Sequence, residues 1–351
     1  MVYNLSIEKN IEKVRDYLKT AKNPLIFFDD DPDGLCSFLL LYHYMKKAYG
    51  VPLKTAPILN ESFLRNIDEY CPDVIFVLDI ANMEQRFIDN IDVPVIWVDH
   101  HPVSEIKRKN LIYINPRKDN NMYLPTSYIC HKIVQQNIWL GVCGSIADYY
   151  LPEYLGEFKK KYIGLFPKKD IIGDITYSSK IGEVIRLFSF ILKGKTSDVK
   201  KNINILKNMG FEELIEKKTP KSNYLWKKYD FVYKKYIKNL EKAEKSVSTD
   251  ELIVYISKSE DDSFVGDIAN ELIYKYPKKI VIVGRTKDGF VRMSMRSSNI
   301  EIYIPLKKAM EGLKGYCGGH EKACGGNIDE RDFGVFLERF RLYLEESKKM
   351  S

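Results

Sequence analysis

Three short apolar runs stand out in the first hundred residues, at 24–28 (PLIFF), 74–78 (VIFVL) and 94–98 (PVIWV). Each run is continuous rather than alternating and is rich in β-branched or aromatic residues, a pattern typical of strands buried on both faces of a sheet. Helical patterns occupy the intervals near 35–48 and 83–90. This alternation of strand and helix predicts a parallel sheet with crossover helices.

Two further segments show helical periodicity. The segment 7–20 places apolar residues on one stripe, namely Ile7, Ile11, Val14 and Leu18. The segment 150–245 is highly charged and mostly helical in pattern. Its last part predicts one long helix that ends near Ser246, on the apolar stripe Leu225, Tyr229, Val232, Tyr236 and Leu240.

After a break at 246–250 (SVSTD) the pattern changes to mixed strands and helices. It predicts, in order, a strand at 251–257, a helix at 263–276, a hairpin of 279–284 with 290–296 around Lys287-Asp288-Gly289, a helix near 305–313, a glycine-rich loop, and a final helix near 329–347. These elements predict a second, smaller α/β domain.

Composition narrows the class of protein. The 351 residues have a mean hydropathy of −0.30, and no apolar run approaches the roughly 20 residues of a membrane helix, so we expect no membrane association. The first twenty residues are charged throughout and do not resemble a secretory signal. None of the six cysteines forms a CxxC pair, which favours reduced thiols and a cytoplasmic location.

The net charge of +7 is unevenly distributed. The segment 151–250 holds 22 basic and 13 acidic residues and so carries +9. Such a basic zone indicates an anionic partner, although a solvated lysine-rich helical surface explains it equally well. Within it, 222–240 interleaves lysines with aromatic residues. We interpret Leu225, Tyr229 and Tyr236 as a core face and the lysines as a phosphate track.

Acidic residues follow each of the three predicted strands. The first strand is followed by Asp29, Asp30, Asp31 and Asp33, the second by Asp79, and the third by Asp99, His100 and His101. Because ligands bind at the carboxyl ends of strands in open α/β sheets, we expect these groups to converge. So many carboxylates require cations, and oxygen ligands with imidazoles suit Mn²⁺ or Mg²⁺. Asp30 fits better as a turn-forming residue. A small-residue segment further on ends at Asp148.

These residues resemble the motifs of the DHH phosphoesterase family. Residues 29–37 fit its HxDxDGxxS motif, except that Asp29 stands where histidine is expected. Asp79 resembles the lone aspartate of the second motif, 99–101 is the Asp-His-His triplet, and 144–148 resembles the fourth motif.

The C-terminal part resembles the DHHA1 domain. Residues 317–326 (CGGHEKACGG) are similar to its GGGHxxAAGG loop, and Met295-Arg296-Ser297-Ser298 is similar to its arginine-bearing strand end. Cys317, His320 and Cys324 would also fit a zinc site, but no fourth Cys or His lies nearby in sequence. The glycines instead favour close approach of backbone N–H groups to a phosphate.

The resemblance implies an α/β fold in three parts: a parallel-sheet DHH metal-binding catalytic domain at 1–190, a basic helical connector at 191–248, and a mixed α/β DHHA1 substrate-binding domain at 249–351, with the active-site cleft between the two domains. It implies two Mn²⁺ ions, with Mg²⁺ or Co²⁺ as alternatives. The first would be held by Asp29, Asp31 and Asp79, and the second by Asp33, Asp79, His100 and Asp148.

In this interpretation Asp79, His100 and His101 are the catalytic residues, with Asp79 bridging the ions and His101 contacting the phosphate. The resemblance further implies a set of substrate-binding residues, namely His101, Arg296, Ser297, Gly318, Gly319, His320, Gly325 and Gly326.

The implied activity is hydrolysis of single-stranded DNA or RNA by a RecJ-like exonuclease of the small archaeal type. We expect DNA to be favoured, 3′→5′ polarity, release of mononucleotides, and a role in DNA repair or replication beside a helicase or another replication protein. The alternatives are a nanoRNase or cyclic-dinucleotide phosphodiesterase, and a weakly catalytic scaffold that resembles Cdc45.

Overall fold

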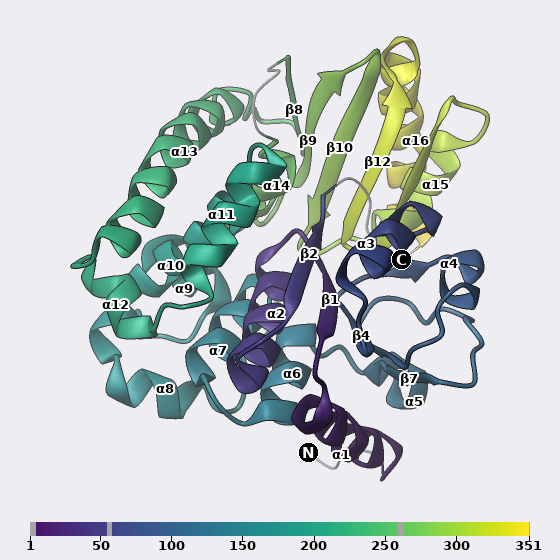
Figure 1. The fold of residues 1–351 in the computed structure, drawn as a ribbon. Helices are drawn as coiled ribbons and strands as arrows, with labels where there is room; N and C mark the ends of the chain where they lie inside the picture. Colours follow the sequence, from purple (N-terminus) through teal and green to yellow (C-terminus); the bar gives the residue numbers. More distant parts are fainter. Residues whose placement is uncertain (1–4, 55–57, 259–262, 351) are drawn as a thin grey trace. The chain divides into compact units, whose positions relative to one another are not determined.

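The computed structural model describes residues 5–54, 58–258 and 263–350. It divides into two compact units, Met1–Trp226 and Lys227–Ser351, whose elements are drawn in Figure 1. We describe each unit by itself. Among the described residues, no helix is both long enough and apolar enough to span a bilayer.

The first unit is built on a five-stranded parallel sheet. Its strand order is β2-β1-β4-β6-β7, with parallel pairing throughout. The strands are β1 (Pro24–Asp29), β2 (Tyr49–Leu53), β4 (Val74–Leu78), β6 (Val95–Val98) and β7 (Leu111–Ile114). The chain leaves β1 toward β2 on one side and later adds β4 on the other side. The carboxyl ends of β1 and β4 therefore flank the topological switch point, where open sheets of this kind bind ligands.

Helices cover both faces of this sheet. On one face α2 packs on β1, where the Phe28 and Phe38 rings stack with centroids 4.6 Å apart, and α6 and α7 pack against α2. The opposite face carries a core that includes Phe27, Val77 and Trp97 and receives Phe87 from α4. Full burial on both faces explains why these strands are continuous apolar runs.

The helices of this unit are α1 (Leu5–Thr20), α2 (Pro32–Met45), α3 (Leu64–Tyr70), α4 (Gln85–Asp89), α5 (Pro116–Asn120), α6 (Thr126–Val134), α7 (Ile138–Ala147), α8 (Leu155–Lys161), α9 (Ile172–Ser178), α10 (Lys180–Ile191), α11 (Thr196–Leu206) and α12 (Phe211–Glu216), with 3-10 turns at Glu61–Phe63 and Ile163–Leu165 and a small pair of β3 (Ile58–Leu59) with β5 (Asn82–Met83). The long helix α13 (Pro220–Glu244) begins in this unit and continues into the second.

The second unit holds a mixed sheet of order β11-β12-β10-β9-β8. Its strands are β8 (Leu252–Ser257), β9 (Ile280–Lys287), β10 (Phe290–Ser297), β11 (Gly315–His320) and β12 (Ala323–Asp329), and its helices are α14 (Val265–Lys275), α15 (Tyr303–Met310) and α16 (Phe333–Met350), the last preceded by a 3-10 turn at Glu330–Asp332. Within the described part of this unit, β8 and β9 pair in parallel, and the other strand pairs of the sheet are antiparallel. Met293, Leu306 and Phe336 belong to the core that joins this sheet to α15 and α16.

The predicted fold class is confirmed: a parallel-sheet domain, a helical region and a smaller mixed domain follow one another. Three details of the sequence interpretation need correction. The segment expected to be a glycine-rich loop is a paired hairpin of β11 with β12, because glycine lowers strand propensity without preventing pairing. The edge strands β2 and β7 were not predicted; β2 contains a glycine and Pro52, a composition that sequence patterns assign to turns and that edge strands tolerate.

Candidate metal centre

The turn from β1 into α2 presents three carboxylates. Asp29 ends β1, and Asp31 caps α2 by accepting a hydrogen bond from the Gly34 backbone N–H (2.8 Å). Asp33 lies in the first helical turn and is 1% exposed. A Cβ atom at Gly34 would lie 2.5 Å from the Asp29 backbone oxygen. Because Gly34 has no side chain, the helix α2 can start directly against the end of β1, and this brings the three carboxylates together.

Asp33 is held by the beginning of a second helix. Its two carboxylate oxygens accept hydrogen bonds from the backbone N–H groups of Thr126 (2.8 Å) and Ser127 (3.0 Å), the first residues of α6. Backbone N–H groups at a helix N-terminus stabilise an anion. They fix the orientation of Asp33, and each oxygen keeps a lone pair for a cation.

Asp79 follows β4 directly and has a backbone φ of +61°. A left-handed conformation at a non-glycine residue is uncommon, and such residues cluster at functional sites where neighbouring structure holds them in place. Here the Asp79 N–H donates to the Val98 carbonyl (3.0 Å), and the Thr126 hydroxyl donates to Asp79 Oδ1 (3.0 Å). These bonds aim the carboxylate at the carboxyl edge of the sheet.

The Asp-His-His triplet follows β6. His100 Nε2 lies 3.2 Å from Asp79 Oδ1, and His100 Nδ1 lies 3.4 Å from Asp148 Oδ2. His101 Nδ1 lies 2.8 Å from Asp99 Oδ1, and the Asp99 side chain is fully buried. A buried carboxylate on Nδ1 fixes the tautomer and orientation of an imidazole, which leaves Nε2 for a ligand or substrate. Asp99 therefore positions His101.

Asp148 caps the C-terminal end of α7 and completes the cluster. The Tyr123 hydroxyl donates to its Oδ2 atom, and the Tyr123 ring packs edge-on against His100 with centroids 5.2 Å apart. Tyr123, Thr126 and Ser127 were not among the site residues predicted from the sequence. They lie in a connecting segment and a helix start that contain no recognisable motif, so no sequence signal pointed to them.

Ligand atoms from these residues converge in three groups, each with its atoms within 4.8 Å of one another. The groups are Asp29, Asp31 and Asp79; Asp33, His100 and Asp148; and Asp79, His100 and His101. Every residue that the sequence analysis named as a metal ligand lies in at least one group. Asp79 occurs in two groups, and its Oδ1 atom contacts His100.

The electrostatics of the cluster fit a bound cation. Burial, followed by the charge of Asp31, raises the pKa of Asp29 to about 8. Burial raises the pKa of Asp79 well above its ordinary range, and the charge of Asp31 adds to this effect. His100 Nδ1 is buried and makes no hydrogen bond within the described part of the chain. Clustered acids that resist ionisation, together with an orphaned imidazole nitrogen, are the environment that a divalent cation would stabilise.

The predicted substrate-binding residues of the second unit lie on three adjacent strands. Arg296 pairs with Ala323 across β10 and β12, and Ala323 pairs with His320 on β11. Arg296 Nε donates to Asn270 Oδ1 (2.6 Å), and Ser297 Oγ accepts from the Ile300 N–H (3.0 Å). The register of the same hairpin brings its glycines together, with Gly318 opposite Gly325, Gly319 opposite Cys324, and Gly326 opposite Cys317.

The zinc alternative receives no support from this geometry. Within the described ranges, the three groups above are the clusters that could hold a metal, and none contains Cys317, His320 or Cys324. The Cys324 thiol instead donates to the His320 carbonyl (3.0 Å).

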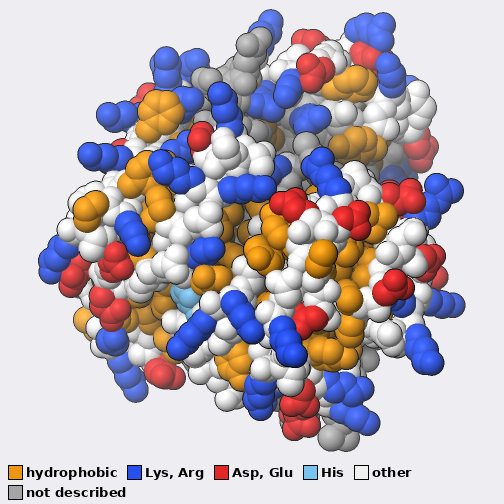
Figure 2. Space-filling model, viewed as in Figure 1, with side chains coloured by type: hydrophobic (Ala, Val, Ile, Leu, Met, Phe, Trp, Pro, Cys, Tyr) orange, Lys and Arg blue, Asp and Glu red, His pale blue; other side chains and the backbone are white. Residues whose placement is uncertain are grey.

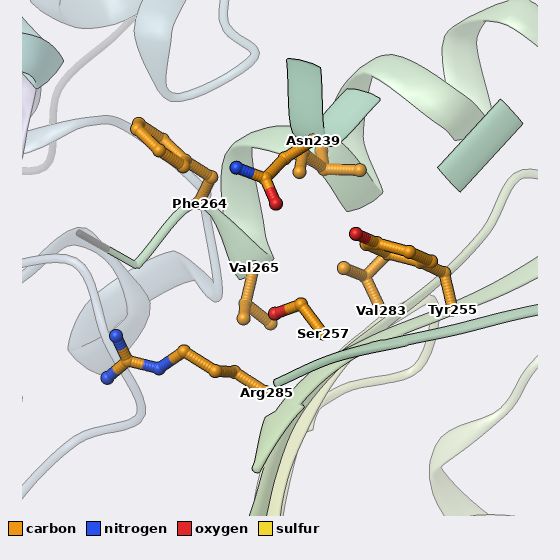
Figure 3. Close-up of a pocket in the computed structure, with 8 residues that line it drawn as sticks. Asn239, Tyr255, Ser257, Phe264, Val265, Val283 and Arg285 are labelled. Carbon is orange, nitrogen blue, oxygen red and sulfur yellow. The ribbon is translucent and has the colours of Figure 1, made fainter. Parts of the chain in front are cut away.

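A separate pocket opens in the second unit between β8, β9, α13 and α14 (Figure 3). Asn239, Tyr255 and Ser257 contribute polar groups, and Phe264 and Val283 contribute apolar walls. It is partly open to solvent, and its inner volume of about 10 Å³ has room for roughly one water molecule. It is too small for a nucleotide, and we assign it no ligand.

Comparison with known proteins agrees with this geometry. Residues 23–161 match the model of the DHH family, N-terminal domain, and residues 249–346 match the DHHA1 domain. The chain belongs to the DHH/DHHA1 family. The predicted family membership is therefore confirmed, and membership in this phosphoesterase family supports a hydrolase. No curated protein sequence matches the chain.

Several solved structures share this DHH/DHHA1 fold. RecJ from Thermus thermophilus in complex with Mn²⁺ has a TM-score of 0.69 at 17% identity, covering 98% of this chain and 55% of that one. An exonuclease RecJ bound to manganese has a TM-score of 0.63 at 16% identity, with 98% and 95% covered. The DHH domain of a member of the s1p family of ribosomal proteins has a TM-score of 0.69 at 14% identity, with 97% and 92% covered. The chain thus spans little more than half the length of the Thermus protein.

Proposed function

We propose that this DHH/DHHA1 protein is a metal-dependent exonuclease that hydrolyses single-stranded nucleic acid to mononucleotides. The observation that carries the proposal is the convergence of five aspartates and His100 at the switch point of the parallel sheet. The RecJ structures that share the fold, one of them an exonuclease and both containing Mn²⁺, support the same reaction. We further propose DNA as the favoured polymer, 3′→5′ polarity and a role in DNA repair or replication.

Two divalent cations, Mn²⁺ or else Mg²⁺ or Co²⁺, fit the ligand groups. Asp29, Asp31 and Asp79 would hold one ion, and Asp33, His100 and Asp148 would hold the other, with Asp79 shared between them. When bound, such ions lower the pKa of water and neutralise charge on phosphoryl oxygens. Asp29 replaces an imidazole with a carboxylate, a harder and more negative ligand that favours Mg²⁺ and Mn²⁺ over softer metals.

The chain's own residues supply positioning. Asp99 holds His101 with Nε2 available to contact a phosphoryl oxygen. The α6 backbone N–H groups keep Asp33 oriented, and the Thr126 hydroxyl does the same for Asp79. In the second unit, Arg296 and His320, with the glycines of the β11–β12 hairpin, would bind the phosphates of the strand.

A cleavage series tests the proposal. Purified protein is incubated with Mn²⁺, Mg²⁺, Co²⁺ or EDTA and with 5′-labelled single strands of DNA and RNA, two to thirty nucleotides long. We expect a metal-dependent ladder on the long strands, which indicates removal of nucleotides from the 3′ end. Immediate release of the labelled terminal nucleotide would reverse the polarity.

The other outcomes of this series contradict the proposal. Cleavage confined to the shortest oligomers would instead indicate a nanoRNase or a small-dinucleotide phosphodiesterase. No cleavage with any metal would indicate a scaffold of the Cdc45 type, and the loss of the usual histidine at Asp29 would then be the first change to reverse.

A further inference from the structure

The helix α13 separates its aromatic residues onto two faces. Tyr229, Val232 and Tyr236 are buried, and the Tyr236 hydroxyl donates to Glu271 of α14. These rings belong to the core, as the sequence analysis inferred for Tyr229 and Tyr236. Phe231 lies on the other face and is 57% exposed.

Two lysines flank the exposed ring. The ammonium of Lys235 lies 4.8 Å from the Phe231 ring centroid, and that of Lys228 lies 6.0 Å from it. The two lysines come from the helical turns before and after Phe231, so both can reach the ring, and the residue still remains more than half exposed. Cation–π attraction holds this arrangement without burying the ring.

The surroundings of Phe231 are strongly basic. The segment 227–240 contains five lysines and one acid, Asp230, which is exposed. Lys227, Lys234 and Lys238 lie on the same helix. Figure 2 shows that Lys and Arg side chains crowd the surface over α13, with apolar side chains among them.

We propose that Phe231, with Lys228 and Lys235, forms a base-stacking platform for single-stranded nucleic acid. Sequence-tolerant binders of single strands combine aromatic faces, on which bases stack, with basic groups along the phosphates. The charge of the surface complements this occupant. The inference rests on the proposed function, because it concerns the same substrate at a position outside the metal centre.

A protein partner fits this surface less well. Lysine is depleted at protein–protein interfaces, whereas lysines surround this ring. One exposed ring also supplies far less than the roughly 1,000 Å² that a specific protein interface buries.

Binding measurements on the 351-residue chain test the platform. Fluorescence anisotropy would follow 5′-fluorescein-labelled dT30 and rU30 in EDTA, where no cleavage occurs. We expect Phe231→Leu, which keeps an apolar side chain but removes the aromatic face, to weaken binding about 5- to 100-fold. Phe231→Trp should retain or strengthen binding.

Charge is tested by a second pair of variants. Lys228→Ala with Lys235→Ala should lower the slope of log Kd against log salt by about 1.4, the value for two phosphate contacts on a single strand. The matched control is Lys9→Ala with Lys13→Ala, two exposed lysines of α1, which should leave the slope unchanged. Exposed substitutions of this kind rarely disturb folding.

Turnover in Mn²⁺ separates the platform from the proposed function. Phe231→Leu should raise KM for a 30-mer and leave cleavage of a dinucleotide unchanged. If the unaltered chain cleaves nothing but Phe231→Leu still weakens dT30 binding, the exonuclease proposal fails and the platform stands.

Three outcomes would overturn the platform. In the first, the unaltered chain binds neither 30-mer, and in the second, Phe231→Leu and Phe231→Trp both bind as tightly as the unaltered chain. In the third outcome, substitution changes the oligomeric state and leaves the affinity for nucleic acid intact. The last result would assign the surface to a second copy of the chain.

Discussion

The carboxylate cluster of the first unit and the glycine-rich hairpin of the second place their polar groups in opposite environments. Asp33 and Asp79 are 1% exposed, and burial raises the pKa of both carboxyl groups. Gly318 and His320 lie on an edge strand and face solvent at least in part. A buried ligand set is costly without its cation, whereas an exposed hairpin imposes no such cost. We therefore expect changes in the cluster to alter chemistry and stability together, and changes in the hairpin to alter substrate binding alone.

The largest effect is expected from Asp79→Asn. The amide keeps the size of the side chain, tolerates the left-handed backbone and can still accept the Thr126 hydrogen bond. It removes one charge from the centre of the cluster. Turnover of a 30-mer should fall at least about 10³-fold, and calorimetry should show weaker Mn²⁺ binding.

The metal-free variant should be at least as stable as the unaltered chain, because a buried amide is neutral at every pH, whereas the buried carboxyl group must take up a proton to be neutral. Asp68→Asn, a change on α3 away from the cluster, is the control and should behave like the unaltered chain. Wild-type Mn²⁺ affinity in Asp79→Asn would rule out the ligand assignment.

The next largest effect is expected from Gly144→Ala, which should lower the stability of the protein. A Cβ atom there would lie 2.4 Å from Ser127 Oγ and 2.6 Å from Ser127 Cβ. To remove this clash, α7 and α6 must move apart, and overpacking of this kind lowers the free energy of unfolding by about 1–3 kcal/mol. The movement would also shift the Ser127 N–H group, which donates to Asp33. Urea unfolding measures the loss.

Gly156→Ala provides the contrast to this change. No atom of the described residues lies within 4 Å of a Cβ atom at Gly156, which sits in the first turn of the helix α8. This change should leave the stability unchanged or raise it by up to about 0.5 kcal/mol, because Gly156 lies in the first turn rather than the middle of the helix. Equal effects of the two substitutions would contradict close packing beneath the metal centre.

The same contrast explains what the sequence could predict. Asp29, Asp79 and the 99–101 triplet follow apolar runs directly, and strand ends in a parallel sheet meet at one edge, so their convergence could be predicted from local patterns. Tyr123 and Thr126 could not be identified, because their contacts with Asp148 and Asp79 join residues 25 and 47 positions apart.

The hairpin was missed for a related reason. Strand formation at β11 depends on pairing with β12 rather than on local propensity, and glycine lowers that propensity. Gly319 has a φ of +132°, and a Cβ atom there would lie 2.5 Å from the Ala323 oxygen. Gly319 permits close pairing of β11 with β12. This pairing is a tertiary contact, so a pattern read one residue at a time does not reveal it.

A smaller effect is expected from His320→Gln in the hairpin. The residue is exposed, so the substitution should leave stability and Mn²⁺ affinity unchanged while it removes the proposed phosphate contact. We expect KM for a 30-mer to rise about tenfold, the equivalent of one hydrogen bond to a charged group. A fall in kcat with constant KM would instead place His320 in the chemical step and would break the contrast between the two regions.

The smallest effect concerns pH. The carboxyl pKa of Asp29 is about 8 in the fold against an ordinary value of 3.8, so between these values the folded chain holds more protons than the unfolded chain. The free energy of unfolding of the metal-free protein must then fall as pH rises through this window. Thermal unfolding in EDTA should show a midpoint roughly 3–6 °C lower at pH 8 than at pH 5.5. Mn²⁺ binds the ionised carboxylates, so the stabilisation that it provides should grow over the same pH interval.

The variant Asp79→Asn is the control for this pH dependence. It should flatten both trends, since it removes one of the coupled acids. Trends of equal size in the variant and the unaltered chain would show that the pH dependence arises outside the cluster.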